Sequence, residues 1–310
     1  MTFNVLLPEA PAELRHRLQR LIHQSLESAP TEKKPLPVWR PDFFHIDSSR
    51  FWSKLNQSQQ VDFLNAMSKA LLKEAIAIEH AGIAYANKMA LLAETQEERQ
   101  YYTTVANEEL SHLYMLQPYF QFPVETQAPD FSQMIAQLIE NEPKRDSVIL
   151  IQVLLEGWGI HHYQSLLSGT DNTELKSVFS KIVFDEVRHH GGGIILSQSY
   201  GFQLSDGLVN TIQSVIDAVR IGPFQVAMLL AKMNRLTSNH EISEMLISIQ
   251  AEQTTTAKLK LIHQNLSKIF SNDELAKFNW LPYSITEMSH AIASSEIHLE
   301  SEGQSKAASL

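Results

Sequence analysis

Two copies of one pattern of glutamate and histidine constrain the fold of this chain more than any other feature. In each copy a lone glutamate stands 30 positions before a Glu-x-x-His tetrapeptide, and the second copy follows the first by 77 residues. The six residues are Glu79, Glu109, His112, Glu156, Glu186 and His189. Residues three apart share one face of an α-helix, so each tetrapeptide can direct two ligands toward one ion. Two such helices, with two more that contribute one glutamate each, would enclose a two-metal site in a four-helix bundle.

The Glu-x-x-His spacing alone is weak evidence, because the chain has 13 histidines and contains other tetrapeptides of this form. Two of these begin at Glu13 and Glu287. The inner copies differ from them, because each lies in a long helical pattern, follows a second carboxylate (Glu108 or Asp185) and has a glutamate 30 residues upstream. Alanine stands 30 residues before Glu287. We therefore interpret the outer tetrapeptides as solvated pairs on helix faces.

Length and composition limit the class of protein. A chain of 310 residues can bury a large core, and we expect a single domain over 1–310. It contains no apolar run of the ~18 residues that a membrane span needs, and its first 30 residues lack a signal-peptide core, so we expect a cytoplasmic protein without membrane association. The absence of cysteine excludes disulfides, iron–sulfur clusters and Cys-ligated zinc. The net charge of −10 argues against a nucleic-acid partner.

Hydrophobic periodicity and the positions of Gly and Pro predict an all-α protein. We expect an N-terminal helix with a wrapping connector over 1–56, a di-metal four-helix core over 57–200, and additional C-terminal helices over 201–310. The four core helices are expected at about 57–92, 95–119, 146–168 and 172–199. A long crossover separates the second from the third, as in ferritin-like bundles. The fold prediction is therefore a ferritin-like four-helix bundle with extra helices at both ends.

The surroundings of the glutamates favour bound metal. Leu72, Ile76 and Ile83 lie at helical spacing from Glu79, and the other ligands have similar neighbours. Four carboxylates that face a core cost several kcal/mol each unless they are protonated or neutralised, and two metal cations would remove that cost. Four Glu and two His form an oxygen and nitrogen donor set without thiolate. We therefore predict two iron ions (Fe2+/Fe3+), with manganese as the alternative.

The acids that precede the two tetrapeptides have a predicted role of their own. A metal-bound histidine usually donates its second N–H to a carboxylate. Glu108 and Asp185 each stand one position before a ligand glutamate. We predict that Asp185 orients His112 and that Glu108 orients His189, across the bundle.

Glycines that follow the ligands in helical segments indicate a local demand for space. They are Gly157, Gly159, Gly191, Gly192 and Gly193. A glycine inside a helix costs roughly 0.5–1 kcal/mol relative to alanine. These glycines either open a cavity for O2 and substrate or permit close helix packing, and the sequence leaves both interpretations open.

The ligand pattern resembles that of the ferritin-like di-iron carboxylate superfamily over residues 57–200. This superfamily includes bacterioferritin, rubrerythrin, ribonucleotide reductase small subunits, acyl-carrier-protein desaturases, aldehyde-deformylating oxygenases, tRNA hydroxylases and N-oxygenases. The resemblance implies O2 activation at two irons that Glu109 and Glu186 bridge, with Glu79 and Glu156 as terminal ligands. Ile182 stands where the N-oxygenases have a further histidine.

We therefore expect a non-haem di-iron oxygenase or oxidase that oxidises a small, largely apolar metabolite with O2, the six ligands forming its catalytic redox centre. Hydroxylation, desaturation, N-oxygenation and C–C cleavage all remain open. Electrons are expected from a separate reductase or ferredoxin, because the chain has neither Cys nor a Gly-x-Gly-x-x-Gly motif. The alternatives are a peroxide-scavenging or iron-oxidising protein similar to rubrerythrin or ferritin, and a structural di-metal protein without turnover. A homodimer is possible on the base rate for oligomers, and the sequence leaves the oligomeric state open.

Overall fold

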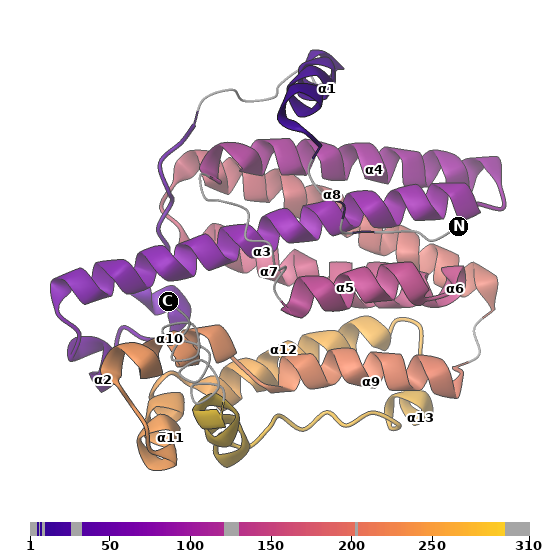
Figure 1. The fold of residues 1–310 in the computed structure, drawn as a ribbon. Helices are drawn as coiled ribbons and strands as arrows, with labels where there is room; N and C mark the ends of the chain where they lie inside the picture. Colours follow the sequence, from indigo (N-terminus) through magenta and orange to yellow (C-terminus); the bar gives the residue numbers. More distant parts are fainter. Residues whose placement is uncertain are drawn as a thin grey trace, which may run out of the picture. The chain divides into compact units, whose positions relative to one another are not determined.

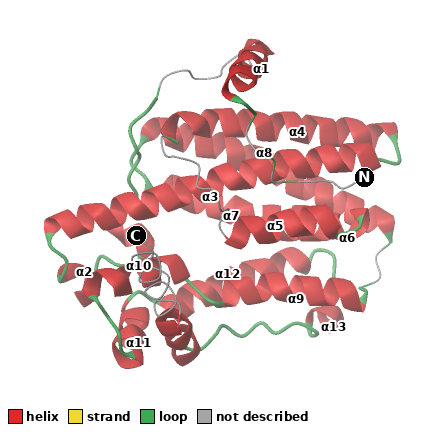
Figure 2. Ribbon diagram, in the orientation of Figure 1, coloured by secondary structure: helices red, strands yellow, loops and turns green. Residues whose placement is uncertain are grey.

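The computed structural model describes residues 5, 7, 10–25, 33–120, 130–201 and 204–294. Within these ranges the chain is helical and has no β-strand (Figure 2). The prediction of an all-α helical bundle is confirmed. The middle of the expected crossover, residues 121–129, lies outside the described residues.

The chain divides into two compact units. The first consists of Met1–Pro37 and Ser68–Phe202, and the second of Val38–Met67 and Gln203–Leu310. Residues 57–67, which the sequence analysis assigned to the four-helix core, group with the second unit. The expected single domain over 1–310 stays a prediction.

The first unit contains the helices that carry the repeated pattern (Figure 1). Its elements are α1 (Ala12–Ser25), most of α3 (Gln57–Leu92), α4 (Gln96–Leu116), a short 3-10 turn η2 (Gln117–Tyr119), α5 (Asp130–Asn141), α6 (Lys144–Ser147), the π-helical turn η3 (Val148–Leu155), α7 (Glu156–Gly169) and α8 (Thr173–Tyr200). Helix α8 packs against both α4 and α7. The four core helices therefore occur where the sequence predicts them.

Side-chain caps fix where two of the ligand helices begin. The Thr95 hydroxyl accepts a hydrogen bond from the Glu98 backbone N–H at 3.1 Å at the start of α4. The Asn172 side chain accepts one from the Leu175 N–H at 2.9 Å at the start of α8. Such caps satisfy N–H groups that have no partner within the helix. They stabilise the first turns of the two helices that carry Glu-x-x-His.

The third core helix is not a regular α-helix throughout. Residues Val148–Leu155 form a π-helical turn that ends directly before Glu156, the first residue of α7. A π-turn has i→i+5 hydrogen bonds, and such turns are frequent at functional sites. The turn changes the direction of the side chains that follow it, so the position of Glu156 depends on it.

The second unit contains the remaining helices. They are η1 (Pro41–Phe44), α2 (Arg50–Ser53), α9 (Asp206–Arg220), α10 (Phe224–Asn234), α11 (Asn239–Ser248), α12 (Ala251–Leu266) and α13 (Asn272–Leu275), and residues 285–294 are also helical. The Asn234 side-chain amide of α10 donates a hydrogen bond to the Phe51 carbonyl of α2 at 3.1 Å. Helices α9 to α13 lie within 201–310, where the sequence analysis expects additional helices, whereas η1 and α2 lie within the expected N-terminal connector.

One stretch of the described residues, Asp206–Asn234, is long and apolar enough to cross a membrane by length and composition. It comprises α9 and α10, of 15 and 11 residues, separated at Gly222, whose φ is +85°. Pro223 follows and cannot donate a helical hydrogen bond. Neither helix reaches the ~18 residues of a span. The expected cytoplasmic location stays a prediction.

Candidate metal centre

The structure places the six predicted ligands on four helices of the first unit. They are Glu79 on α3, Glu109 and His112 on α4, Glu156 on α7, and Glu186 and His189 on α8. Five of them are buried, with at most 4% of the residue exposed. Glu156 is partly exposed, although its Oε2 atom is buried. The fold thus brings together the six residues of the repeated pattern, which are far apart in the sequence.

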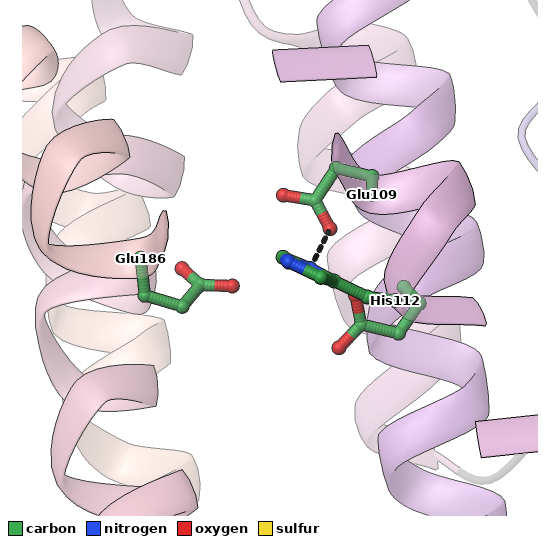
Figure 3. A group of neighbouring side chains, drawn as sticks. Glu109, His112 and Glu186 are labelled. Atoms are coloured by element: carbon green, nitrogen blue, oxygen red, sulfur yellow. Dashed lines mark hydrogen bonds and ion pairs between the residues drawn. The ribbon is translucent and has the colours of Figure 1, made fainter. Parts of the chain in front are cut away.

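The ligand atoms form two groups that share one residue. One group contains Glu79, Glu109, His112 and Glu186, and the other contains Glu109, Glu156 and His189. Within each group the ligand atoms lie within 4.8 Å of one another. Glu186 faces Glu109 and His112 from α8 (Figure 3). Glu109 can therefore contact two ions, whereas the ligand atom of Glu186, a second bridge in the resemblance, belongs to the first group only.

Both imidazole rings turn Nδ1 toward these carboxylates. His112 Nδ1 lies 3.1 Å from Glu79 Oε2 and 3.8 Å from Glu109 Oε2. His189 Nδ1 lies 3.1 Å from Glu109 Oε1, but outside hydrogen-bonding geometry. Each histidine therefore offers one nitrogen to a cation among the glutamates.

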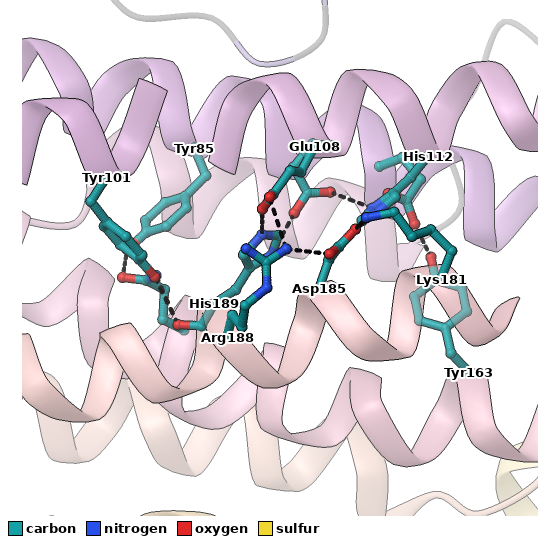
Figure 4. Close-up of polar contacts among 12 residues, drawn as sticks. Tyr85, Tyr101, Glu108, His112, Tyr163, Lys181, Asp185, Arg188 and His189 are labelled. Carbon is teal, nitrogen blue, oxygen red and sulfur yellow. Dashed lines mark hydrogen bonds and ion pairs between the residues drawn. The ribbon is translucent and has the colours of Figure 1, made fainter. Parts of the chain in front are cut away.

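The opposite nitrogen of each ring contacts the acid that the sequence analysis assigned to it (Figure 4). His112 Nε2 lies 2.9 Å from Asp185 Oδ2, and His189 Nε2 lies 2.8 Å from Glu108 Oε2. A carboxylate that accepts from Nε2–H leaves the lone pair on Nδ1. Both contacts are present as paired from the sequence, and their role in orienting metal ligands stays a prediction.

Arg188 connects the two acids, which the sequence analysis did not anticipate. Its guanidinium lies 2.8 Å from Glu108 Oε1 and also contacts Asp185 Oδ1, while Lys181 contacts Asp185 Oδ2. Burial raises the pKa of Asp185, but the hydrogen bond with His112 and the two cations outweigh it and hold that pKa below its usual range. The sequence does indicate these contacts, because Lys181 stands four residues before Asp185 and Arg188 three residues after it. This spacing places both cations on the helix face of Asp185.

The carboxylates cannot all be ionised here without additional positive charge. Burial raises the pKa of Glu79 to about 7 and that of Glu156 to about 8, and the charge of Glu109 adds to both shifts. Burial raises the pKa of Glu186 well above its usual value. For His189, burial lowers the pKa, but Glu108 and Glu109 outweigh it and raise that pKa to about 11. If all four glutamates were ionised, they would carry more negative charge than two protonated histidines can balance.

Unpartnered atoms in the cluster fit a metal centre. Glu156 Oε2, Glu186 Oε2 and His189 Nδ1 are buried and have no hydrogen-bond partner. Buried polar atoms of this kind are rare in folded proteins and cost about 1–3 kcal/mol each. Two divalent cations would give all three atoms a partner, and a set of carboxylates and imidazoles suits iron or manganese. The residues present therefore fit a two-metal site.

Gly82 is a residue of the site that the sequence analysis missed. A Cβ atom at this position would lie 2.6 Å from Glu109 Cδ and Oε2. Only glycine leaves the Glu109 carboxylate in its place between the two groups. The sequence feature that could have indicated Gly82 is its position three residues after Glu79, on the same face of α3.

The glycines beside the ligands divide between the two interpretations left open by the sequence. A Cβ at Gly192 would lie 2.1 Å from Tyr101 Oη, and one at Gly193 would lie 2.4 Å from Gln152 Cβ. These two glycines permit close helix packing. A Cβ at Gly159 or Gly191 would meet nothing within 4 Å. Close packing therefore does not require glycine at these two positions, and of the two only Gly159 lines a cavity.

A hydrogen-bond network of three tyrosines and Gln152 lies beside the second ligand group. Gln152 is the one polar residue of the apolar stretch Val148–Leu155. Gln152 Oε1 accepts hydrogen bonds from Tyr85 Oη at 3.1 Å and Tyr102 Oη at 2.9 Å. Its Nε2 donates to Tyr101 Oη at 2.9 Å and to the His189 carbonyl at 3.2 Å. The network fixes the backbone of His189, and the signal for it was one glutamine within Val148–Leu155.

The fold and the site define an all-α helical protein with a buried cluster of carboxylates and histidines that can hold metal ions. Comparison of the sequence with models of known protein families and with characterised proteins finds no match.

Asp185→Asn is expected to weaken metal binding without unfolding the protein. The amide removes the charge that fixes the His112 tautomer, and loss of such a partner typically costs about 10–100-fold in metal affinity. Titration of the metal-free protein with Fe2+ under nitrogen measures the effect, with the exposed Asp62→Asn as the control. Equal affinities in Asp185→Asn and wild type would contradict the orienting role.

Gly82→Ala is expected to remove metal while the fold remains. Alanine favours a helix interior over glycine by about 1 kcal/mol, so the helix itself tolerates the change. The new Cβ must displace the Glu109 carboxylate, which belongs to both ligand groups. Elemental analysis and circular dichroism together measure the outcome, and Gly191→Ala, where the Cβ meets nothing, is the matched control. Wild-type metal content in Gly82→Ala would contradict the requirement for glycine beside the Glu109 carboxylate.

Proposed function

We propose that this chain is a ferritin-like di-iron oxidoreductase that uses O2 to oxidise a small, largely apolar metabolite. One observation carries the proposal: the two groups of ligand atoms share Glu109, and each contains a histidine whose second nitrogen contacts a carboxylate. This arrangement suits a pair of ions held side by side. The donor set, rich in carboxylate and without thiolate, favours iron or manganese.

Each residue has a defined task in this proposal. Glu79, Glu109, His112 and Glu186 would hold one ion, and Glu109, Glu156 and His189 the other. Asp185 and Glu108 keep the histidine Nδ1 atoms available as ligands. When bound, iron would supply a redox centre at which O2 is reduced.

The Tyr163 hydroxyl holds one ligand carboxylate in place. It donates a hydrogen bond to Glu79 Oε1, so the Glu79 Oε2 atom remains for His112 and the first ion. Tyr163 is fully buried, and burial raises its pKa well above the usual value, so the hydroxyl keeps its proton. This group therefore acts as a fixed donor to Glu79.

Electrons for O2 reduction must come from outside the chain in this proposal. The sequence contains no cysteine and therefore no iron–sulfur cluster of its own. A separate reductase or ferredoxin is the proposed donor. The apolar lining of the space beside Glu156 and Glu186 supports an organic substrate over iron storage.

Oxygen uptake by iron-loaded protein distinguishes this function from its alternatives. With Fe2+ and O2 alone, we expect oxidation of about two irons per chain and then no further uptake, because the site holds two ions. With an external reductant, sustained uptake should require an apolar organic compound. Oxidation of many irons per chain would favour storage. Rapid consumption of peroxide without an organic compound would favour peroxide scavenging, and either result would contradict the proposal.

A further inference from the structure

A cavity in the first unit reaches the candidate metal centre. Its empty space, together with the part that is open to solvent, amounts to about 530 Å3. Helices α3, α5 and α7 and the π-helical turn supply its apolar wall: Ile78, Ile135, Ile139, Ile151, Leu155 and Trp158. Glu109, Glu156 and Glu186 also line it. A molecule inside would therefore contact both hydrocarbon and the ligand carboxylates.

The charges of the cavity select against anions. Among the described residues that line it, Lys, Arg and His are absent, and the ionisable carboxylates are Glu109, Glu156 and Glu186. An anionic group inside would be desolvated without a protein cation to pair with it, which is costly. Tyr163 also lines the cavity, but its hydroxyl already donates to Glu79. The cavity thus offers few groups to polar ligands.

Gly159 keeps part of this volume open. It is buried and lines the cavity, and a Cβ built on it meets nothing within 4 Å. Gly192, in contrast, would place a Cβ 2.1 Å from Tyr101 Oη and so serves close packing. A glycine inside a helix costs roughly 0.5–1 kcal/mol relative to alanine. Contact with a neighbouring helix does not account for glycine at position 159, whereas room for a bound molecule does.

We propose that this cavity binds the substrate through an uncharged hydrocarbon segment, and that Gly159 sets how much of that segment it admits. The claim that the bound molecule is a substrate rests on the proposed function. The claim that the cavity binds an uncharged hydrocarbon segment rests on the cavity alone. The segment would lie between Ile135 and Ile139 of α5 and the start of α7, with its inner end against Glu156 and Glu186.

Binding of octan-1-ol to the full-length, Fe2+-loaded protein under nitrogen tests the proposal by calorimetry, without turnover. Octanedioate is the charged counterpart, and it is compared with the alcohol on the metal-free protein, where no iron can bind a carboxylate that enters the cavity. We compare wild type with Gly159→Leu and with Gly191→Leu. The latter is the matched control, because a Cβ there also meets nothing and Gly191 does not line the cavity.

We expect octan-1-ol to bind wild type and Gly191→Leu equally, and to bind Gly159→Leu about tenfold more weakly or worse, since the leucine occupies ligand volume. Octanedioate should bind metal-free wild type at least about tenfold more weakly than the alcohol. If Gly159→Leu does not fold, Gly159→Ala should show a smaller loss in the same direction. Equal binding to wild type and the folded Gly159 variant, equal binding of the two ligands, or no binding of octan-1-ol to wild type would overturn the proposal.

Metal content and oxygen uptake separate this inference from the proposed function. Protein that holds iron but binds no octan-1-ol would refute the cavity proposal and leave the metal centre standing. Protein that binds the alcohol but takes up no O2 with any apolar compound would refute the oxygenase function and leave the binding site standing.

Discussion

The burial of four glutamate carboxylates inside one helical bundle is the constraint on which the rest of the structure depends. Several ionised carboxylates in an apolar core repel one another and lose hydration, which costs several kcal/mol per group without compensation. Burial accordingly raises the pKa values of Glu79, Glu156 and Glu186. In addition, the Oε2 atoms of Glu156 and Glu186 are buried without a hydrogen-bond partner. Two bound cations would neutralise the carboxylates and give these atoms a partner.

The hydrogen bonds around the cluster make the two halves of the repeat depend on each other. Helix α4 supplies His112 and the acid that contacts His189, while α8 supplies His189 and the acid that contacts His112. A shift of one helix along the other would break both contacts. Arg188 contacts both acids from the surface side, where its side chain is 46% exposed. The crossed pairs therefore fix the register of α4 against α8 and, with it, the distance between the ligand groups.

The ligand cluster could be predicted because a repeated spacing encodes which residues share a helix face, and the all-α class followed from periodicity. The π-helical turn could not, because Val148–Leu155 is apolar on all sides apart from Gln152 and so carries no periodic signal. The requirement for Gly82 was equally hidden, since it depends on the distance to Glu109 on another helix. Helix α3 continues across both compact units without a break in composition, which concealed their boundary.

We expect Glu109 to contribute to both metal sites of this bundle, because it belongs to both groups of ligand atoms. Metal content per chain, measured by elemental analysis after expression with added iron, tests it most directly in wild type, Glu109→Ala and Glu287→Ala. Glu287 belongs to an outer Glu-x-x-His and hydrogen-bonds the exposed Ser284. We expect about two irons per chain in wild type and Glu287→Ala, and loss of both in Glu109→Ala. Little metal in wild type, or full content in Glu109→Ala, would contradict the account.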